Sequence, residues 1–300
     1  MGETSAKKHR AGFVNIIGNP NVGKSTLMNA LVGEKLSIVT AKAQTTRHRI
    51  MGIVNTDDYQ IVYSDTPGIL KPNYRLQQSM MKFVETAIGD ADIILYVTDV
   101  VEKGDKNDEY IAKLRQVECP VVLAVNKIDL SDQPKVLELM AWWKEQLPKA
   151  EIFPVSAKEK FNLESVYETI VGHLPVSPPW FDKDAFTDRN LRFFASEIIR
   201  GQILRRYDKE IPYCCEIAID TYKEEPAIDR IAASIYVARD SQKGILIGHK
   251  GERLKEVGRG AREELEEFLG KKVFLQLFVK VNDDWRNNLR ELKRFGYELE

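Results

Sequence analysis

The chain has 300 residues, of which 43% are hydrophobic and 30% charged, and its formal net charge is -1. This length suits about two domains of ordinary size, and the near-neutral charge means that any surface for a polyanion must be local. Three cysteines, two of them adjacent, exclude a disulfide framework and favour a reducing compartment. The sequence shows no signal-peptide pattern and no apolar run long enough to span a membrane. We therefore expect a cytoplasmic protein.

Strand-like and helix-like runs alternate in the N-terminal half. Residues 13–18 form a short apolar run ending in glycine, which predicts a buried strand, and a helical pattern then extends from Lys24 to about Gly33. Runs at 50–55 and 59–65 predict a hairpin. Three more apolar runs follow, each before an amphipathic stretch, at 91–100, 119–129 and 150–157. This alternation predicts a mostly parallel sheet with helices on both faces and the hairpin as an antiparallel edge.

The pattern changes after residue 175. Residues 176–190 contain prolines without periodicity, which is typical of a linker between domains. The expected elements beyond it are a helix at 191–207, strands at 213–222 and 229–239, a glycine-rich turn at 245–251, a helix at 252–269, a strand at 272–281 and a last helix from Trp285. We therefore expect domains at 1–175 and 191–300, the second a smaller α+β domain.

The residues from Gly18 to Ser25 fit the phosphate-loop pattern G-x-x-x-x-G-K-[ST], after a strand and before a helix. The glycines let backbone N–H groups turn inward as an anion nest, and the helix dipole adds to that field. Lys24 is expected to contact the β- and γ-phosphates, and the Ser25 hydroxyl to bind Mg²⁺. The expected nucleotide contacts of this loop are Gly18, Asn19, Asn21, Val22, Gly23, Lys24, Ser25 and Thr26.

Two further segments are expected at the metal and the γ-phosphate. Asp65 ends a strand, where it can hold the water shell of the metal, and the N–H of Gly68 can meet the γ-phosphate. The polar loop at 35–49 is long, and one of its threonines can complete the metal shell. Thr46 is preferred, and Thr45 remains an alternative. The expected metal ligands are therefore Ser25, Thr46 and Asp65.

The motif NKID predicts the choice of base. Asp129 can accept from the N1–H and the exocyclic amine of guanine, a pair of donors that adenine does not present, and leaving such groups unpaired is costly. The motif VSAK would close over the base. The expected base contacts are Asn126, Lys127, Asp129, Ser156, Ala157 and Lys158. All these motifs lie at carboxyl ends of predicted strands, where open α/β sheets bind ligands, so GTP and GDP are the expected ligands.

At these residues the chain resembles the Era family of bacterial GTPases. The match includes "GNPNVGKSTLMN", "AQTTRHRIMGI", "DTPGI", "NKID" and "VSAK", then "FFASEIIRGQILRRYDKEIPY" and "ILIGHKG". The resemblance implies an α/β P-loop GTPase domain that hydrolyses GTP to GDP and phosphate. It also implies assembly of the small ribosomal subunit through binding of the 3′ end of its RNA, with the pre-30S particle as partner of a monomer. Peripheral association with the inner membrane face is left open.

Two residues depart from the Ras-type pattern. Ile69 stands where Ras-type GTPases have a glutamine that orients water, so another group must do this. Asn21 lies in the middle of the phosphate loop, and in related GTPases a matching asparagine helps to hold K⁺, which offsets charge between the β- and γ-phosphates. Asn21 can also serve only to favour a tight loop. The residues expected to act in hydrolysis are Lys24, Asn21, Thr46 and Gly68.

The C-terminal half carries Gly248-His249-Lys250-Gly251 before a helix, the position at which a KH domain clamps a nucleic-acid backbone. A helix before the first strand matches the type II variant. From Arg239 to Arg262 there are seven basic residues and three acidic ones. Residues 245–247 can line a groove for bases or pack in the core. The expected RNA contacts are Gly248, His249, Lys250, Gly251, Arg253 and Lys255.

Three other functions remain open from the residues alone. One is an RNA chaperone that binds nucleotide without turnover. The absence of a water-orienting glutamine, with Ile69 at its position, is consistent with this function. Another is a small-molecule P-loop kinase, against which the NKID motif argues. The third is a tRNA-modifying GTPase, against which the KH-like half argues.

Overall fold

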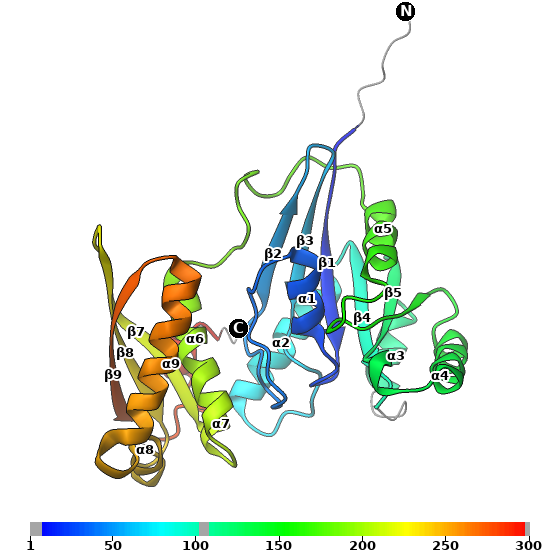
Figure 1. Ribbon diagram of the computed structural model, residues 1–300. Helices are drawn as coiled ribbons and strands as arrows, with labels where there is room; N and C mark the ends of the chain where they lie inside the picture. Colours follow the sequence, from blue (N-terminus) through cyan, green and yellow to red (C-terminus); the bar gives the residue numbers. More distant parts are fainter. Residues whose placement is uncertain (1–7, 102–107, 298–300) are drawn as a thin grey trace, which may run out of the picture. The chain divides into compact units, whose positions relative to one another are not determined.

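The computed structural model describes residues 8–101 and 108–297 and divides the chain into two compact units (Figure 1). Unit 1 comprises Met1–Ser37, Thr46–Leu70 and Met81–Asp188. Unit 2 comprises Ile38–Thr45, Lys71–Met80 and Arg189–Glu300. Two short segments of the N-terminal half, a loop and the start of a helix, thus group with the C-terminal half by their contacts.

Unit 1 is built on a six-stranded sheet in the order β2-β3-β1-β4-β5-β6. The strands are β1 (Arg10–Gly18), β2 (Ile50–Asn55), β3 (Tyr59–Asp65), β4 (Ile93–Asp99), β5 (Val121–Asn126) and β6 (Glu151–Pro154). Only the β2–β3 pair in this sheet is antiparallel, so the hairpin forms the expected edge. All seven residues of β4 are buried, as in a strand covered on both faces.

The helices of this half follow the expected order. They are α1 (Lys24–Val32), α2 (Arg75–Gly89), α3 (Asp108–Leu114), α4 (Gln133–Gln146) and α5 (Leu163–His173). Asp132 caps α4 by accepting a hydrogen bond from the Lys135 amide, with proline in the first turn. Parallel strands joined by helices bring the carboxyl ends of β1, β4 and β5 to one edge, which is where the phosphate and base motifs follow.

The segment 176–188 belongs to unit 1. Its backbone forms isolated bridges from Val176 to Arg10 and from Thr187 to Gly52. The side chain of Gln60 accepts from the amides of Trp180 and Phe181. These contacts attach most of the expected linker, 176–190, to the sheet edge. The domain ranges 1–175 and 191–300 stay a prediction, to which the contacts add that residues 38–45 and 71–80 group with the C-terminal half.

Unit 2 is an α+β unit with the three-stranded sheet β7-β8-β9. Its elements are α6 (Leu191–Arg206), α7 (Ile211–Cys214), β7 (Cys215–Glu224), β8 (Ile228–Val237), α8 (Asp240–Ile247), α9 (Glu252–Leu269), β9 (Lys272–Val281) and α10 (Leu289–Arg294). In Figure 1, α6 and α9 lie on one face of this sheet. Side chains from α6, α9 and the strands form two apolar clusters, a large one and a smaller one. A helix before the first strand agrees with the expected type II KH order.

Two details of unit 2 differ from the sequence-based expectation. The glycine-rich turn follows a helix, α8, that the sequence pattern did not predict, because its apolar residues are confined to its end, after Gly244, and show no helical period. The last helix begins at Leu289 rather than at Trp285, since Asn288 caps it and its side chain accepts from the Arg290 amide. Trp285 is fully buried and its indole N–H donates to the Cys214 carbonyl, so it is a core residue.

None of the described helices has both the length and the apolar composition required to cross a bilayer. All three cysteines are free thiols.

Candidate nucleotide site and nucleic-acid interface

The phosphate loop has a backbone that requires glycine at its end. Gly23 has φ +96°, and a Cβ there would lie 2.3 Å from Nδ2 of Asn126. Lys24 opens α1 and is 6% exposed. Its ammonium donates to the carbonyls of Gly18 (3.1 Å) and Asn19 (2.8 Å). The loop therefore holds the lysine above its own backbone, at the N-terminus of a helix, where an anion is stabilised.

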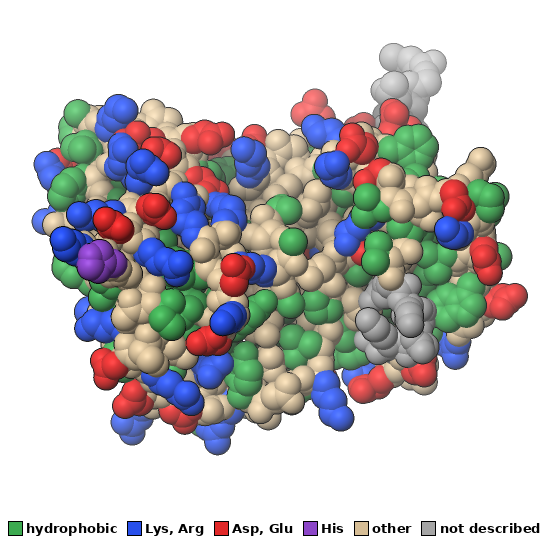
Figure 2. All heavy atoms as spheres, turned by 60° about the horizontal axis from the view of Figure 1, so that its bottom comes forward, with side chains coloured by type: hydrophobic (Ala, Val, Ile, Leu, Met, Phe, Trp, Pro, Cys, Tyr) green, Lys and Arg blue, Asp and Glu red, His purple; other side chains and the backbone are tan. Residues whose placement is uncertain are grey.

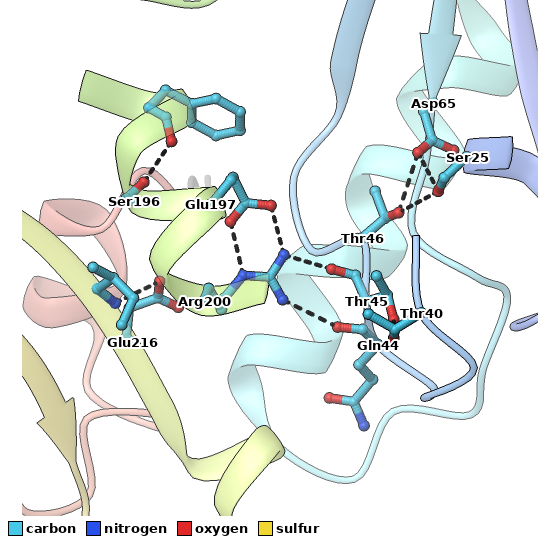
Figure 3. A network of polar contacts seen from close by, with 12 residues as sticks. Ser25, Thr40, Gln44, Thr45, Thr46, Asp65, Ser196, Glu197, Arg200 and Glu216 are labelled. Carbon is cyan, nitrogen blue, oxygen red and sulfur yellow. Dashed lines mark hydrogen bonds and ion pairs between the residues drawn. The ribbon is translucent and has the colours of Figure 1, made fainter. Parts of the chain in front are cut away.

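The three expected metal ligands lie together (Figure 3). The Ser25 hydroxyl donates to Oδ2 of Asp65 at 2.6 Å, and Thr46 Oγ1 donates to the same atom at 3.1 Å. The two hydroxyl oxygens are 2.9 Å apart. The other carboxylate oxygen of Asp65, Oδ1, is buried without a hydrogen-bond partner. Two hydroxyls beside an unpartnered carboxylate oxygen form an all-oxygen set that fits Mg²⁺ and its water shell.

Burial dominates the electrostatics of Asp65. The side chain is fully buried, and desolvation raises its pKa above the ordinary value. The charge of Lys24 and hydrogen bonds from the nearby hydroxyls oppose this and lower the pKa, but they do not outweigh burial. A buried carboxylate short of partners is stabilised by a cation at its free oxygen.

Thr45 is turned differently from Thr46. Its hydroxyl donates to the Lys42 carbonyl at 2.6 Å and lies 2.6 Å from the hydroxyl of Thr40. The side chain is thus used inside its own loop. This geometry favours Thr46 over Thr45 as the metal ligand.

The base-binding motifs interlock with the phosphate loop. The amide of Asn126 donates to the Val22 carbonyl at 2.8 Å, and its oxygen accepts from the Ala157 N–H at 2.9 Å. The Ser156 hydroxyl donates to Oδ1 of Asp129 at 2.6 Å. Asp129 itself is exposed, in the short 3₁₀ turn Ile128–Leu130 that follows β5. One carboxylate is therefore oriented by a neighbour and open to a ligand.

Lys127 crosses the same region. Its ammonium donates to the Asn21 carbonyl and forms an ion pair of 2.6 Å with Asp99. Asp99 ends β4 and is 4% exposed. Asp99 is not among the residues expected from the sequence, although its place at the carboxyl end of a predicted strand is a usable signal. Lys158 is exposed and pairs with Glu159, and its charge also interacts with that of Asp129, while its contact with the base stays a prediction.

Asn21 is exposed and has φ +66°, the left-handed region in which asparagine is enriched. Its backbone conformation is thus a reason for asparagine that is independent of any ion. Thr26 is half-buried in the first turn of α1.

Gly68 and Ile69 follow the end of β3 closely. A Cβ on Gly68 would lie 2.7 Å from Cα of Pro20, so only glycine fits beside the phosphate loop. The Ile69 amide donates to the Gly18 carbonyl at 3.1 Å, and the side chain is 5% exposed. Ile69 therefore fastens the segment after β3 to the phosphate loop and packs as an apolar residue.

The GxxG turn lies between α8 and α9. Gly248, Lys250 and Gly251 have positive φ values of 71°, 48° and 78°. The side chains of His249 and Lys250 are exposed. Left-handed residues on both sides of an exposed lysine leave the backbone accessible at the N-terminus of α9, where phosphate is stabilised.

Basic side chains surround this turn, and in Figure 2 Lys and Arg side chains crowd the surface of unit 2 with acidic ones between them. Arg253 and Lys255 are exposed in the first turns of α9. Of residues 245–247, Leu246 is fully buried in the core, whereas Ile245 is 41% exposed. Leu246 therefore packs in the core, whereas Ile245 is accessible to a groove for bases.

Comparisons with known proteins give the family. A family model described as a 50S ribosome-binding GTPase matches residues 13–127, and one described as a KH domain matches residues 210–286. GTPase Era of Staphylococcus haemolyticus is 42% identical over 292 residues, which are 97% of this chain and 98% of that protein. GTPase Era of a Geobacter species is 44% identical over 98% of this chain and all of its own length. This chain belongs to the Era family of GTPases.

Solved Era structures agree with this membership. A variant of Aquifex aeolicus Era bound to GDP·AlF₄⁻ has 39% identity and a TM-score of 0.92, covering 97% of this chain and 100% of that one. Era in complex with MgGDPNP and nucleotides 1506–1542 of 16S ribosomal RNA has 39% identity and a TM-score of 0.93, with the same coverage. The expected fold, a P-loop GTPase unit followed by a KH unit, is confirmed.

Membership in the Era family makes this chain a GTPase. It sets aside the three other functions that the residues left open, which were a chaperone without turnover, a small-molecule kinase and a tRNA-modifying enzyme.

Proposed function

We propose that this Era GTPase is a switch that binds the 3′ end of small-subunit ribosomal RNA through its KH unit and acts in assembly of the pre-30S particle. The observation that carries the proposal is the exposed GxxG turn with left-handed backbone at Gly248, Lys250 and Gly251, ahead of the basic first turns of α9. The relative crystallised with 16S ribosomal RNA supports the choice of RNA.

At the nucleotide, the phosphate loop binds the β- and γ-phosphates through backbone N–H groups and Lys24. Ser25, Thr46 and Asp65 hold Mg²⁺, which would neutralise charge on the phosphate oxygens. Thr46 and the N–H of Gly68 report on the γ-phosphate, because both lie in segments that meet the phosphate loop. Their release after hydrolysis is the switch.

The base is held at the other end of the site. Asp129 accepts from the two guanine donors. The hydrogen bond from the Ser156 hydroxyl to Oδ1 of Asp129 fixes the orientation of this carboxylate. The Ala157 backbone and Asn126 close the base site, and Lys127 covers the loop at Asn21. Adenine is rejected because it offers no matching pair of donors, which leaves the carboxylate unpaired.

Hydrolysis needs a group other than Ile69 to orient water, since that side chain is apolar and buried. We propose that Asn21 helps to hold K⁺, which would offset charge between the β- and γ-phosphates. The exposed position of Asn21 beside the phosphate loop supports this. Its left-handed backbone is a competing reason for the residue, so the two must be separated by experiment.

The RNA proposal is tested by charge reversal. Lys250→Glu should weaken binding of a short single-stranded RNA from the small-subunit 3′ end by about tenfold, because a phosphate contact is lost and a repulsion is added. Fluorescence anisotropy at fixed salt measures this. Lys272→Glu makes the same charge change at an exposed position of β9 and is the control.

GTP turnover with and without this RNA, in potassium buffer, completes the test. Turnover without RNA should be equal in the parent protein and in both variants, since both lysines belong to unit 2 and the nucleotide motifs to unit 1. Equal RNA affinity of Lys250→Glu and Lys272→Glu would overturn the assignment of the GxxG turn.

The cytoplasm is the proposed location, supported by the three free thiols. A monomeric state and peripheral membrane association stay predictions.

A further inference from the structure

A buried ion pair on α6 contacts the loop formed by residues 38–45. Arg200 and Glu197 lie one turn apart, and their side chains are 1% and 7% exposed. Nε of Arg200 donates to one carboxylate oxygen of Glu197 at 2.7 Å and Nη2 donates to the other at 2.5 Å. This bidentate pair fixes the plane of the guanidinium, as Figure 3 shows.

The remaining donors of Arg200 are aimed at the loop backbone. Nη2 donates to the Thr45 carbonyl at 2.5 Å, and Nη1 approaches the Gln44 carbonyl at 3.5 Å. Gln44 has φ +57°, a conformation that a residue other than glycine adopts only when its surroundings hold it there. The guanidinium thus binds the carbonyls of two successive peptides, Gln44–Thr45 and Thr45–Thr46, directly after Gln44.

The position of this contact in the chain gives it a consequence for the nucleotide. Thr45 is joined by one peptide bond to Thr46, whose hydroxyl lies beside Ser25 and Asp65. Arg200 binds the carbonyl of the Thr45–Thr46 peptide. Rotation of this peptide would move Thr46 Oγ1, because the peptide is planar and ends at the Thr46 backbone.

We infer that Arg200, oriented by Glu197, is a positioning residue for GTP hydrolysis that holds Thr46 at the metal and γ-phosphate. The inference rests on the proposed role of Thr46. It makes α6 the element of unit 2 that senses whether Thr46 is in place. By thermodynamic linkage, what shifts α6 should also shift the affinity for GTP, whereas GDP should bind as before because it has no γ-phosphate.

A second contact of the same loop leads from α6 toward the GxxG turn. Lys42 donates to the carbonyl of Tyr207, the residue that ends α6, and forms an ion pair of 2.8 Å with Asp208. The Tyr207 hydroxyl donates to the Leu246 carbonyl at 2.6 Å, near the end of α8. The loop that precedes Thr46 and the helix that precedes Gly248 are therefore bonded to the same helix.

A variant that removes the contact of Arg200 with the loop must not leave a buried, unpaired charge behind. Arg200→Met alone would strand the Glu197 carboxylate and unfold part of unit 2. The double variant Glu197→Leu/Arg200→Met removes both charges, and such apolar replacement of a buried pair is often neutral for stability. The matched control is Arg192→Met, because Arg192 is also on α6 but donates to the carbonyls of Ile219 and Asp220.

The measurement is the affinity for a non-hydrolysable GTP analogue and for GDP, each in a magnesium titration, with thermal melting to verify folding. The double variant should bind the analogue about tenfold more weakly and require more magnesium, and bind GDP within about twofold of the parent. Arg192→Met should match the parent for both nucleotides. A structural defect would weaken both ligands alike, so equal loss for the analogue and GDP overturns the inference, as does no loss at all.

Thr46→Val separates this failure from that of the proposed function. If Thr46→Val weakens the analogue selectively and the double variant does not, Thr46 keeps its role and Arg200 loses the one inferred here. If Thr46→Val leaves the analogue and GDP equally bound, the proposed role of Thr46 itself is wrong, and the inference goes with it.

Discussion

The two ends of the nucleotide site are held by different parts of the chain. At the base end, Ser156 donates to Asp129, and Asn126 is bonded to the backbone of Val22 and Ala157, all within unit 1. At the phosphate end, Thr46 belongs to unit 1, but the loop immediately before it groups with unit 2 and is bonded by Arg200. The segment 71–80, which follows the DTPG motif, also groups with unit 2.

This difference has a functional meaning. Guanine is the same in GTP and GDP, so its recognition gains nothing from contact with an RNA-binding unit. The γ-phosphate distinguishes the two nucleotides, and a switch requires that its contacts favour one of two arrangements. Base-end changes should therefore affect GTP and GDP equally, and phosphate-end changes should separate them.

The largest effect is expected at the base end. Asp129→Ala removes a charged acceptor of two hydrogen bonds and should weaken GTP binding by about 3 kcal/mol, roughly 100-fold or more. GDP binding should fall by the same factor, because both nucleotides carry the same base. Calorimetry with each nucleotide in the presence of magnesium measures this.

The control for Asp129→Ala is Asp132→Asn, which removes a nearby exposed charge but keeps a good cap for α4. It should bind both nucleotides as the parent does. A loss after Asp129→Ala that is confined to GTP would break the proposed division between the two ends.

A smaller effect is expected at the phosphate end, and it concerns stability. Asp65 has a pKa raised by burial, so the folded protein holds this proton more tightly than the unfolded chain. Its contribution to stability is therefore most favourable below the unfolded pKa and is lost as the pH rises through the folded pKa. Asp65→Asn should remove this loss and stabilise the metal-free protein at neutral pH by about 1–2 kcal/mol.

Denaturant unfolding of Asp65→Asn and the parent in a chelating buffer, from pH 5 to pH 8, tests this prediction. The gain should grow with pH, and the variant should no longer distinguish GTP from GDP when magnesium is added. Asp57→Asn, in the exposed turn of the β2–β3 hairpin, is the control for a surface carboxylate. A variant less stable than the parent at neutral pH would show that Asp65 is stabilising as a charged group.

Much of unit 1 follows from local signals in the sequence. Buried parallel strands appear in the sequence as continuous apolar runs, and the phosphate and base motifs follow these runs directly. The order of the motifs, and their place at the carboxyl ends of the strands, could therefore be predicted. The preference for Thr46 over Thr45 was harder, because adjacent threonines have the same local signal. The hydrogen bonds of Thr45 inside its own loop and that of Thr46 to Asp65 separate them.

Long-range contacts explain what the sequence missed. The helix α8 contains Gly244 and is short, so its pattern is weak, and the core contact of Leu246 stabilises it. The partnership of Arg200 with the Thr45 carbonyl joins residues 155 positions apart, and a backbone acceptor leaves no trace in residue type. The ion pair of Asp99 with Lys127 likewise spans two strands that only the sheet brings together.

The smallest effect separates two reasons for Asn21. Glycine adopts the left-handed backbone as readily as asparagine, so Asn21→Gly keeps the loop conformation and removes the side chain with its amide oxygen. If that oxygen helps to bind K⁺, the variant should lose the acceleration of GTP turnover by potassium over sodium, a factor of about ten. Affinity for GDP should be unchanged, as for any change that acts at the γ-phosphate end. Asn21→Ala changes the backbone preference as well, and it should lose nucleotide affinity in addition to the potassium effect. Equal potassium acceleration in Asn21→Gly and the parent would mean that the residue serves the shape of the loop alone, because the backbone is then the one property that the two proteins share at this position.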